Sequence, residues 1–281
     1  PIENLKGEVV GFTGRIFNGE DNTAKYLNTK ETEIFKKSSL LFNYHNAKNY
    51  IRDRKSVIVV EGNMDAIKMS AKGFKNVVAL MGVALSNEQI DILKRLKVPV
   101  ILMLDNDNAG EDATIKNGES LLNSDVDTKV VRLSGAKDPD EYLEKFGIDA
   151  MQNNIDKAIK YIDFKIECLK KDKDLSNMED LITYVKEVIN SINGEDDLTK
   201  EIILSKISKD YAIDIDILKS NLKTEVKKDA KKEETQEVRD KKLTKYQKAS
   251  HKVLYYMLMD SKYINLYKNT LGYFKERIER V

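Results

Sequence analysis

Uniformly apolar runs alternate with segments of helical periodicity through the first half of the chain. The runs predict strands at 56–60, 77–80 and 98–104, and a fourth strand is expected at 128–133. The helical spacing between them predicts helices at 64–72, 86–96 and 109–122. Ser86, with Gln89 three residues later, predicts a capping box at the start of the second helix. Because the first three strands are apolar at nearly every position, they are typical of a parallel sheet covered on both faces, and we expect an α/β fold.

The pattern on either side of this region is different. Residues 8–17 read as a strand and 47–54 as a short helix. From Gly147 to residue 222 the apolar residues recur at helical spacing, which predicts a small all-helical segment. Between residues 223 and 245 there are nine Lys or Arg and six Asp or Glu, so this stretch is expected to be a linker. A new apolar pattern follows it and runs to residue 281.

Composition excludes some classes of protein. The formal net charge of +1 gives no indication of a nucleic-acid partner, so any basic surface must come from local clustering. No apolar run approaches the roughly 20 residues that a membrane helix needs. Cys168 is the single cysteine, which excludes an intrachain disulfide and favours the cytoplasm. Cys168, His45 and His251 cannot build a four-ligand zinc site.

Acidic residues follow three of the predicted strands. Glu61 follows 56–60, Asp105 and Asp107 follow 98–104, and an Asp-Pro-Asp-Glu sequence at 138–141 follows 128–133. Ligands of an open parallel sheet bind beyond the carboxyl ends of its strands, so we expect these acids to share one edge. Converging carboxylates need a counter-charge, and a hard divalent cation with oxygen ligands supplies one.

Each acidic group also has a purely structural interpretation. Asp138, Pro139 and Glu141 form a typical helix start, which is compatible with metal binding. Asp105-Asn106-Asp107 could form only a turn, and Glu61 could be an ordinary strand end. Their occurrence together, at one edge of one sheet, favours a metal site.

These residues resemble the toprim domain of bacterial primases, topoisomerases and some nucleases. That domain has a Glu after one strand and Asp-x-Asp after another, here Glu61 and Asp105-x-Asp107. The flanking sequence resembles bacterial DNA primases in particular, although Asn106 and Asn108 replace the more usual Gly and Arg or Lys. Matching segments are Val60 to Asp65, Asp138 to Glu141, Gly11 to Arg15, Lys25 to Asn28, Glu31 to Thr32, and Ile34 to Lys37.

The resemblance implies a fold and a domain order. We expect a toprim parallel sheet with flanking helices, preceded by part of a mixed α/β subdomain and followed by an all-helical subdomain. The implied domains are 1–52 (part of the amino-terminal polymerase subdomain), 53–146 (toprim), 147–222 (helical subdomain), 223–246 (charged linker) and 247–281 (a truncated start of a helicase-binding domain). The chain is expected to be an internal fragment.

The resemblance also implies an activity: synthesis of RNA primers on single-stranded DNA from NTPs, by nucleotidyl transfer assisted by Mg²⁺ or Mn²⁺. The implied partners are the template, the primer and the replicative helicase. The implied metal-binding residues are Glu61, Asp105, Asp107, Asp138 and Asp140, with Asp65 as a further candidate. Glu61 is either a ligand or the general base. The implied nucleotide- and template-binding residues are Arg15, Lys25, Asn28 and Lys37.

Three alternatives remain open. The first is another toprim enzyme, a nuclease or topoisomerase, but the latter needs a nucleophilic Tyr and none stands in a recognisable motif. The second is a phosphatase with an Asp nucleophile in Asp105-x-Asp107, but phosphatases usually carry that motif after the first strand of the sheet. The third is a non-catalytic replisome interaction fragment.

Overall fold

The computed structural model describes residues 1–15, 26–82 and 84–222, and the single positions 253, 257 and 266. The chain divides into two compact units, Pro1–Ala212 and Ile213–Val281. In the second unit, residues 215–222 are helical. The linker expected at 223–246 and nearly all of the segment 247–281 lie outside the described residues, as does Lys25, so these expectations remain predictions.

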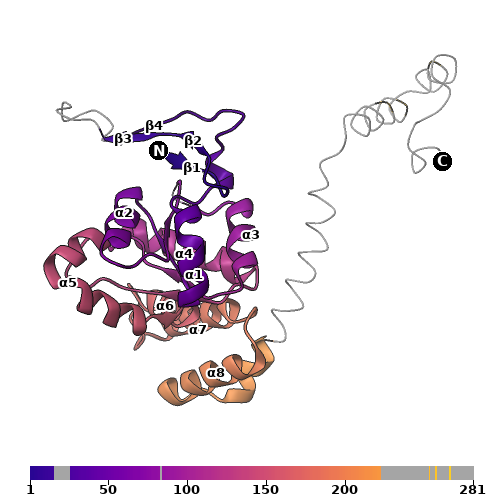
Figure 1. The fold of residues 1–281 in the computed structure, drawn as a ribbon. Helices are drawn as coiled ribbons and strands as arrows, with labels where there is room; N and C mark the ends of the chain where they lie inside the picture. The colour runs from indigo at the N-terminus through magenta and orange to yellow at the C-terminus, as the bar shows by residue number, and fades with distance from the viewer. Residues whose placement is uncertain (16–25, 83, 223–252, 254–256, 258–265, 267–281) are drawn as a thin grey trace. The chain divides into compact units, whose positions relative to one another are not determined.

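A five-stranded sheet forms the centre of the first unit (Figure 1). Its spatial order is β6-β5-β7-β8-β9. The strands are β5 (Val57–Val60), β6 (Val77–Ala79), β7 (Val100–Leu102), β8 (Thr128–Val130) and β9 (Ile159–Lys160). The first four are parallel and β9 joins β8 antiparallel, which confirms the expected α/β class. The sequence pattern did not predict β9, because two residues are too few to show a period.

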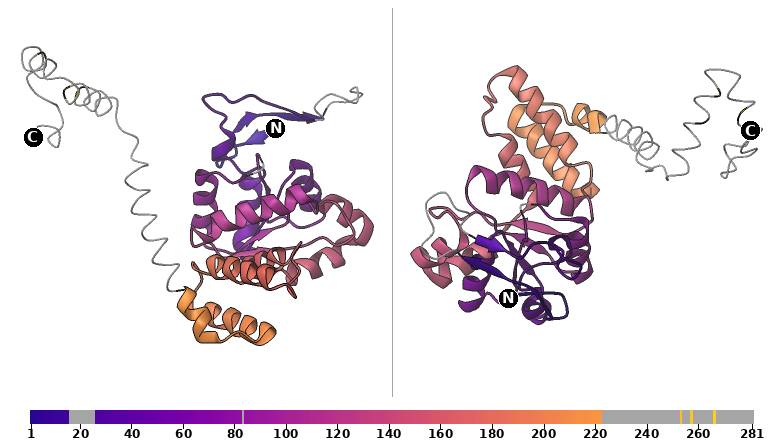
Figure 2. Two further views of the ribbon diagram at one scale, coloured as in Figure 1. Left: turned by 180° about the vertical axis from the view of Figure 1, so that it is seen from behind. Right: turned by 90° about the horizontal axis from the view of Figure 1, so that it is seen from above.

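Helices cover both faces of this sheet (Figure 2). Alternate residues of β5 point to opposite faces: Val57 and Val59 into one core, Ile58 and Val60 into the other. The helices on the first face are α1 (Tyr44–Arg54), α3 (Asn87–Leu96), α4 (Asn108–Leu122) and α6 (Tyr161–Leu169). Those on the second face are α2 (Asn63–Ala71) and α5 (Pro139–Asp156). Burial on both faces explains why β5, β6 and β7 are apolar at every position.

The amino-terminal segment is a set of short strands beside the sheet, near α2 and α3 (Figure 1). They are β1 (Ile2–Glu3), β2 (Val9–Gly11), β3 (Thr13–Arg15) and β4 (Tyr26–Asn28), followed by the 3₁₀ helix η1 (Lys37–Ser39). The prediction of one continuous strand at 8–17 is therefore wrong, because β2 and β3 are separate strands. β2 pairs with β1 and β3 with β4, and between them the Phe12 N–H donates to the Thr29 hydroxyl at 2.8 Å.

The segment 147–222, expected to be all-helical, begins within α5 and includes the strand β9. Gly147 has φ 82° and interrupts the helical backbone, a conformation that glycine adopts without strain. Two further helices follow α6: α7 (Met178–Ser191), capped by Asn177, and α8 (Asp197–Tyr211), capped by Asp196. Of the helices in the described part of the chain, none is both long and apolar enough to span a membrane.

Candidate metal centre

Glu61 leaves the sheet at the end of β5, the buried strand beside which the strand order reverses. β6 lies on one side of β5 and β7 on the other, so the carboxyl ends of β5 and β7 flank the crevice typical of ligand sites in open α/β sheets. Gly62 then starts α2 without a side chain. A Cβ there would lie 2.5 Å from Oδ2 of Asp65, so only glycine lets Asp65 fold back over the turn.

The second acidic group follows β7 and starts α4. Asp107 is the N-cap, and its Oδ1 accepts a hydrogen bond from the Gly110 N–H at 2.8 Å. Gly110 lies against the backbone of Asp105, and a Cβ at position 110 would overlap the Asp105 carbonyl. This close approach brings Asp105 and the start of α4 together.

The third group starts α5, as the sequence predicts. The side chain of Asp138 accepts from the Glu141 N–H at 2.8 Å, and Pro139 occupies the first turn. The reciprocal bond is shifted by one residue from a capping box. Glu141 Oε2 accepts from the N–H of Lys137, at 2.6 Å, rather than from that of Asp138.

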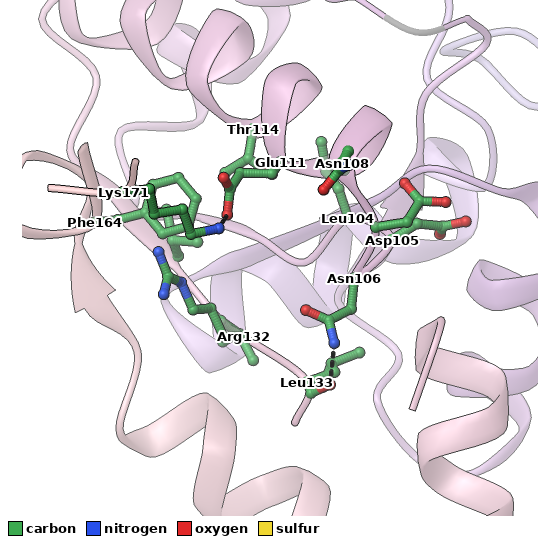
Figure 3. Close-up of a pocket in the computed structure, with 13 residues that line it drawn as sticks. Leu104, Asp105, Asn106, Asn108, Glu111, Thr114, Arg132, Leu133, Phe164 and Lys171 are labelled. Atoms are coloured by element: carbon green, nitrogen blue, oxygen red, sulfur yellow. Dashed lines mark hydrogen bonds and ion pairs between the residues drawn. The ribbon is translucent and has the colours of Figure 1, made fainter. Parts of the chain in front are cut away.

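The loops that carry the second and third groups are hydrogen-bonded to each other through Asn106. Its Nδ2 donates to the carbonyl oxygens of Leu133 at 3.0 Å and Ala136 at 3.2 Å, and its backbone N–H donates to that of Lys137 at 2.7 Å. Figure 3 shows the amide turned toward Leu133. Sequence reasoning did not identify this role for Asn106.

Asp65 is buried, with 8% of its surface exposed, and contacts α5. It accepts hydrogen bonds from the backbone N–H groups of Asp140 and Gly62, which lower its pKa. Burial, and next the charge of Asp138, outweigh them and raise the pKa of Asp65 to about 6. Asp140 itself binds the ammonium group of Lys68, which also contacts Glu144 at 3.3 Å.

The acids at this edge lie within range of mutual repulsion. The pKa of Asp105 is raised to about 7, first by burial and then by the nearby carboxylates of Glu61, Asp65, Asp138 and Asp107. Burial also raises the pKa of Glu61, followed by the charge of Asp107, while Lys137 lowers it. Glu61, Asp107 and Asp138 therefore lie close enough to Asp105 for their charges to raise its pKa, as expected of acids that converge at one edge.

The donor set suits a hard divalent cation. Its donors are carboxylate oxygens, the ligands that Mg²⁺ accepts while it keeps several waters. Within the described ranges, no three His, Cys, Asp or Glu side chains form a ready-made metal-binding group. The structure therefore brings these acids to one edge, and direct coordination by them remains a prediction.

The predicted nucleotide- and template-binding residues lie on the amino-terminal segment. Arg15 ends β3 and Asn28 ends β4, two strands whose register pairs Thr13 with Asn28. Lys37 begins η1, where its carbonyl accepts from Gln89 Nε2 at 3.1 Å. This bond fastens η1 to the start of α3. Within the described part of the chain, Asn28 and Lys37 form no hydrogen bond or ion pair with Glu61, Asp105, Asp107 or Asp138.

A pocket of about 170 Å³ opens beside the Asp105–Asp107 turn (Figure 3). The guanidinium of Arg132 lies 4.5 Å from the ring centroid of Phe164, and Lys171 Nζ lies 2.5 Å from Glu111 Oε2. These cations on the far wall were not predicted, because a single Arg after an apolar strand carries no recognisable signal.

Comparison with known proteins agrees with this architecture. Residues 1–48 match the amino-terminal domain of the DNA primase catalytic core, residues 58–143 a toprim-like domain, and residues 162–216 the DnaB-helicase binding domain of primase. The DNA primase of Clostridium acetobutylicum is 35% identical over 229 residues, which cover 81% of this chain and 38% of that protein.

The chain belongs to the bacterial DNA primase family.

Solved primase structures have the same fold. A DNA primase domain from Pseudomonas aeruginosa matches with a TM-score of 0.67 and 26% identity, over 79% of this chain and 70% of that one. A primase catalytic domain bound to single-stranded DNA matches with a TM-score of 0.65 and 28% identity, over 77% and 69% of the two chains. The chain spans 38% of the length of the clostridial relative, so it corresponds to one part of a primase.

The helicase-binding match overlaps the segment that we predicted to be the helical subdomain. It covers 162–216, whereas the resemblance to bacterial primases implied a helicase-binding domain that starts at 247–281. The match therefore adds a second candidate region for this contact, within the described helices.

Proposed function

We propose that this chain carries the nucleotidyl-transfer site of a primase, which synthesises RNA primers on single-stranded DNA from NTPs. The proposal rests on the proximity of four carboxylates at the carboxyl edge of a toprim-like sheet, where the strand order reverses. These are Glu61, Asp105, Asp107 and Asp138, and the charges of the other three raise the pKa of Asp105. The related catalytic domain bound to single-stranded DNA supports the choice of template. A cytoplasmic location follows from this role.

The acidic edge would hold Mg²⁺ or Mn²⁺ through Glu61, Asp105, Asp107 and Asp138. Bound divalent cations neutralise charge on the attacking and leaving oxygens of phosphoryl transfer. Asp65 and Asp140 complete the acidic set. Both already have partners, because Asp65 accepts from the backbone N–H groups of Asp140 and Gly62, and Asp140 binds Lys68. Glu61 is a ligand or the general base for the primer 3′-hydroxyl.

The amino-terminal strands would hold the anionic substrates. Arg15, Lys25 and Lys37 are proposed to contact phosphates of the incoming nucleotide and template, and Asn28 to hydrogen-bond beside them. Catalysis by these side chains would consist of positioning and charge neutralisation.

A primer-synthesis assay tests the proposal. The chain is incubated with single-stranded DNA, NTPs and Mg²⁺ or Mn²⁺. Asp105→Asn should reduce primer synthesis at least 100-fold, and Arg15→Ala should reduce it while leaving the fold intact. The control is Asp112→Asn, which removes an exposed carboxylate of the same helix α4. Synthesis by Asp105→Asn at the wild-type rate would exclude this site.

We also propose that the carboxyl-terminal part of the chain contacts the replicative helicase. The domain match supports 162–216 as the contact region, and the resemblance to bacterial primases supports 247–281. A chain that ends at Leu222 separates the two. If it binds the helicase as tightly as the full chain, the described helices make the contact. If it loses binding, the segment after Leu222 is required.

A further inference from the structure

The middle residue of the Asp-x-Asp turn links two acid-bearing loops of the sheet edge. Asn106 lies between Asp105 and Asp107, and its three hydrogen bonds end on carbonyl oxygens of Leu133, Ala136 and Lys137. The next residue after that loop is Asp138. The link therefore runs from one pair of acids directly to the next acid.

The carboxamide is chemically required for two of these bonds. Both partners of Nδ2 are backbone carbonyl oxygens, which accept and cannot donate. An Asp at this position would present acceptor oxygens to acceptors, and an Ala would present nothing. Only the bond from the backbone N–H, at 2.7 Å, survives either change.

The link opposes a force that acts on the site. Asp138, on the second loop, repels Asp105 on the first, and this repulsion pushes the two loops apart unless a contact holds them. A Gly at this position could make only the backbone bond, so the two bonds to Leu133 and Ala136 depend on the Asn106 side chain.

We propose that Asn106 is a positioning residue, whose amide holds the Asp105–Asp107 turn and the Leu133–Asp138 loop at the spacing that binds a divalent cation. The inference rests on the proposed metal centre. Asn106 itself need not touch the cation or the substrate.

Mn²⁺ binding to the full chain, measured by electron paramagnetic resonance of the free ion, tests the proposal without an activity assay. Asn106→Ala should weaken Mn²⁺ binding about 5- to 10-fold. Asn106→Asp should also weaken it, although it adds a negative charge beside Asp105. If Asn106 acted only through the charge near the metal, Asn106→Asp would bind Mn²⁺ more tightly. If its amide positions the loops, Asn106→Asp should bind Mn²⁺ more weakly, so the direction of the change in affinity distinguishes the two roles. Asn106→Gly should resemble Asn106→Ala and replaces it if the alanine variant does not fold.

The matched control is Asn108→Ala, which changes the same residue type at the first position of α4. It should change Mn²⁺ affinity less than 2-fold. The proposal is overturned if Asn106→Ala and Asn106→Asp both stay within 2-fold of wild type, if Asn106→Asp binds more tightly, or if the control loses as much affinity. Asp105→Asn distinguishes a failure of the proposed metal centre from a failure of the proposed role of Asn106. If it binds Mn²⁺ as well as the wild type does, the metal centre itself is wrong and the role of Asn106 falls with it.

Discussion

Lys68 on α2 forms an ion pair with Asp140 on α5, 72 residues later in the chain. The same ammonium group contacts Glu144, one helical turn further along α5. Asp65, one turn before Lys68, accepts the backbone N–H of Asp140. Two residues on one face of α2 therefore hold the start of α5, the helix that Asp138 caps.

Loss of the Lys68 charge should loosen this contact. Lys68→Met keeps most of the aliphatic side chain and leaves Asp140 and Glu144 without a shared cation. We expect the free energy of unfolding to fall by about 0.5–1 kcal/mol, because a partly exposed ion pair contributes no more than that. Urea denaturation measures the change, with the exposed Lys72→Met as control. A larger loss for Lys72→Met would contradict this assignment.

The stability of the protein should depend on an acceptor oxygen at position 65, so Asp65→Ala should be more destabilising than Asp65→Asn. Asp65→Ala leaves the N–H groups of Asp140 and Gly62 without their acceptor in a buried site, and we expect a loss of about 2–3 kcal/mol. Asp65→Asn retains an acceptor oxygen. It also removes a carboxyl group whose pKa is raised to about 6 and which is therefore ionised in a buried site at pH 8, so its loss in the free energy of unfolding at that pH should be much smaller. Equal losses in thermal denaturation would show that the hydrogen bonds contribute nothing.

The raised pKa of Asp105 predicts an unusual pH dependence. A carboxyl with a folded pKa of about 7 and an ordinary value of 3.8 disfavours the folded state once it ionises. In the presence of a chelator, its contribution to the free energy of unfolding should decrease from about pH 4 upward and be fully lost above about pH 7.

Asp105→Asn should therefore stabilise the chelated protein at pH 8, by about 1–2 kcal/mol after allowance for solvent screening of a half-buried group, and have little effect near pH 4. Denaturation midpoints at the two pH values check this, with Asp112→Asn as the exposed control. Destabilisation at pH 8 would mean that ionised Asp105 makes a favourable contact.

Gly110 should not tolerate a side chain. A Cβ would overlap the Asp105 carbonyl, which is backbone and cannot rotate away, so Gly110→Ala should cost about 2–3 kcal/mol and displace Asp105. Gly82→Ala is the control, because a Cβ there would have no neighbour within 4 Å. Denaturation and Mn²⁺ binding should both respond at Gly110 only. An unaffected Gly110→Ala would refute the close approach.

The sequence by itself determined the sheet, its two covered faces and the places where acids leave it. A change from the four apolar residues of β5 to Glu61 is visible within a few positions, because strand and turn preferences depend on near neighbours. The helix starts at Ser86 and Asp138 were predicted for the same reason, since a cap bonds to a residue three positions away. The predicted continuous strand at 8–17 failed because a change of pairing partner at Phe12 depends on segments elsewhere.

Only the tertiary structure decided how the acids are held. The bonds from Asn106 to Leu133 and Ala136 span 27 and 30 residues, and the contact of Lys68 with Asp140 spans 72. No local period encodes such pairs, because they depend on the order β5-β7-β8 and on the packing of α2 against α5. Burial then raises the pKa of Asp105 and Asp65, since removal of water disfavours a charged carboxylate whatever the neighbouring sequence.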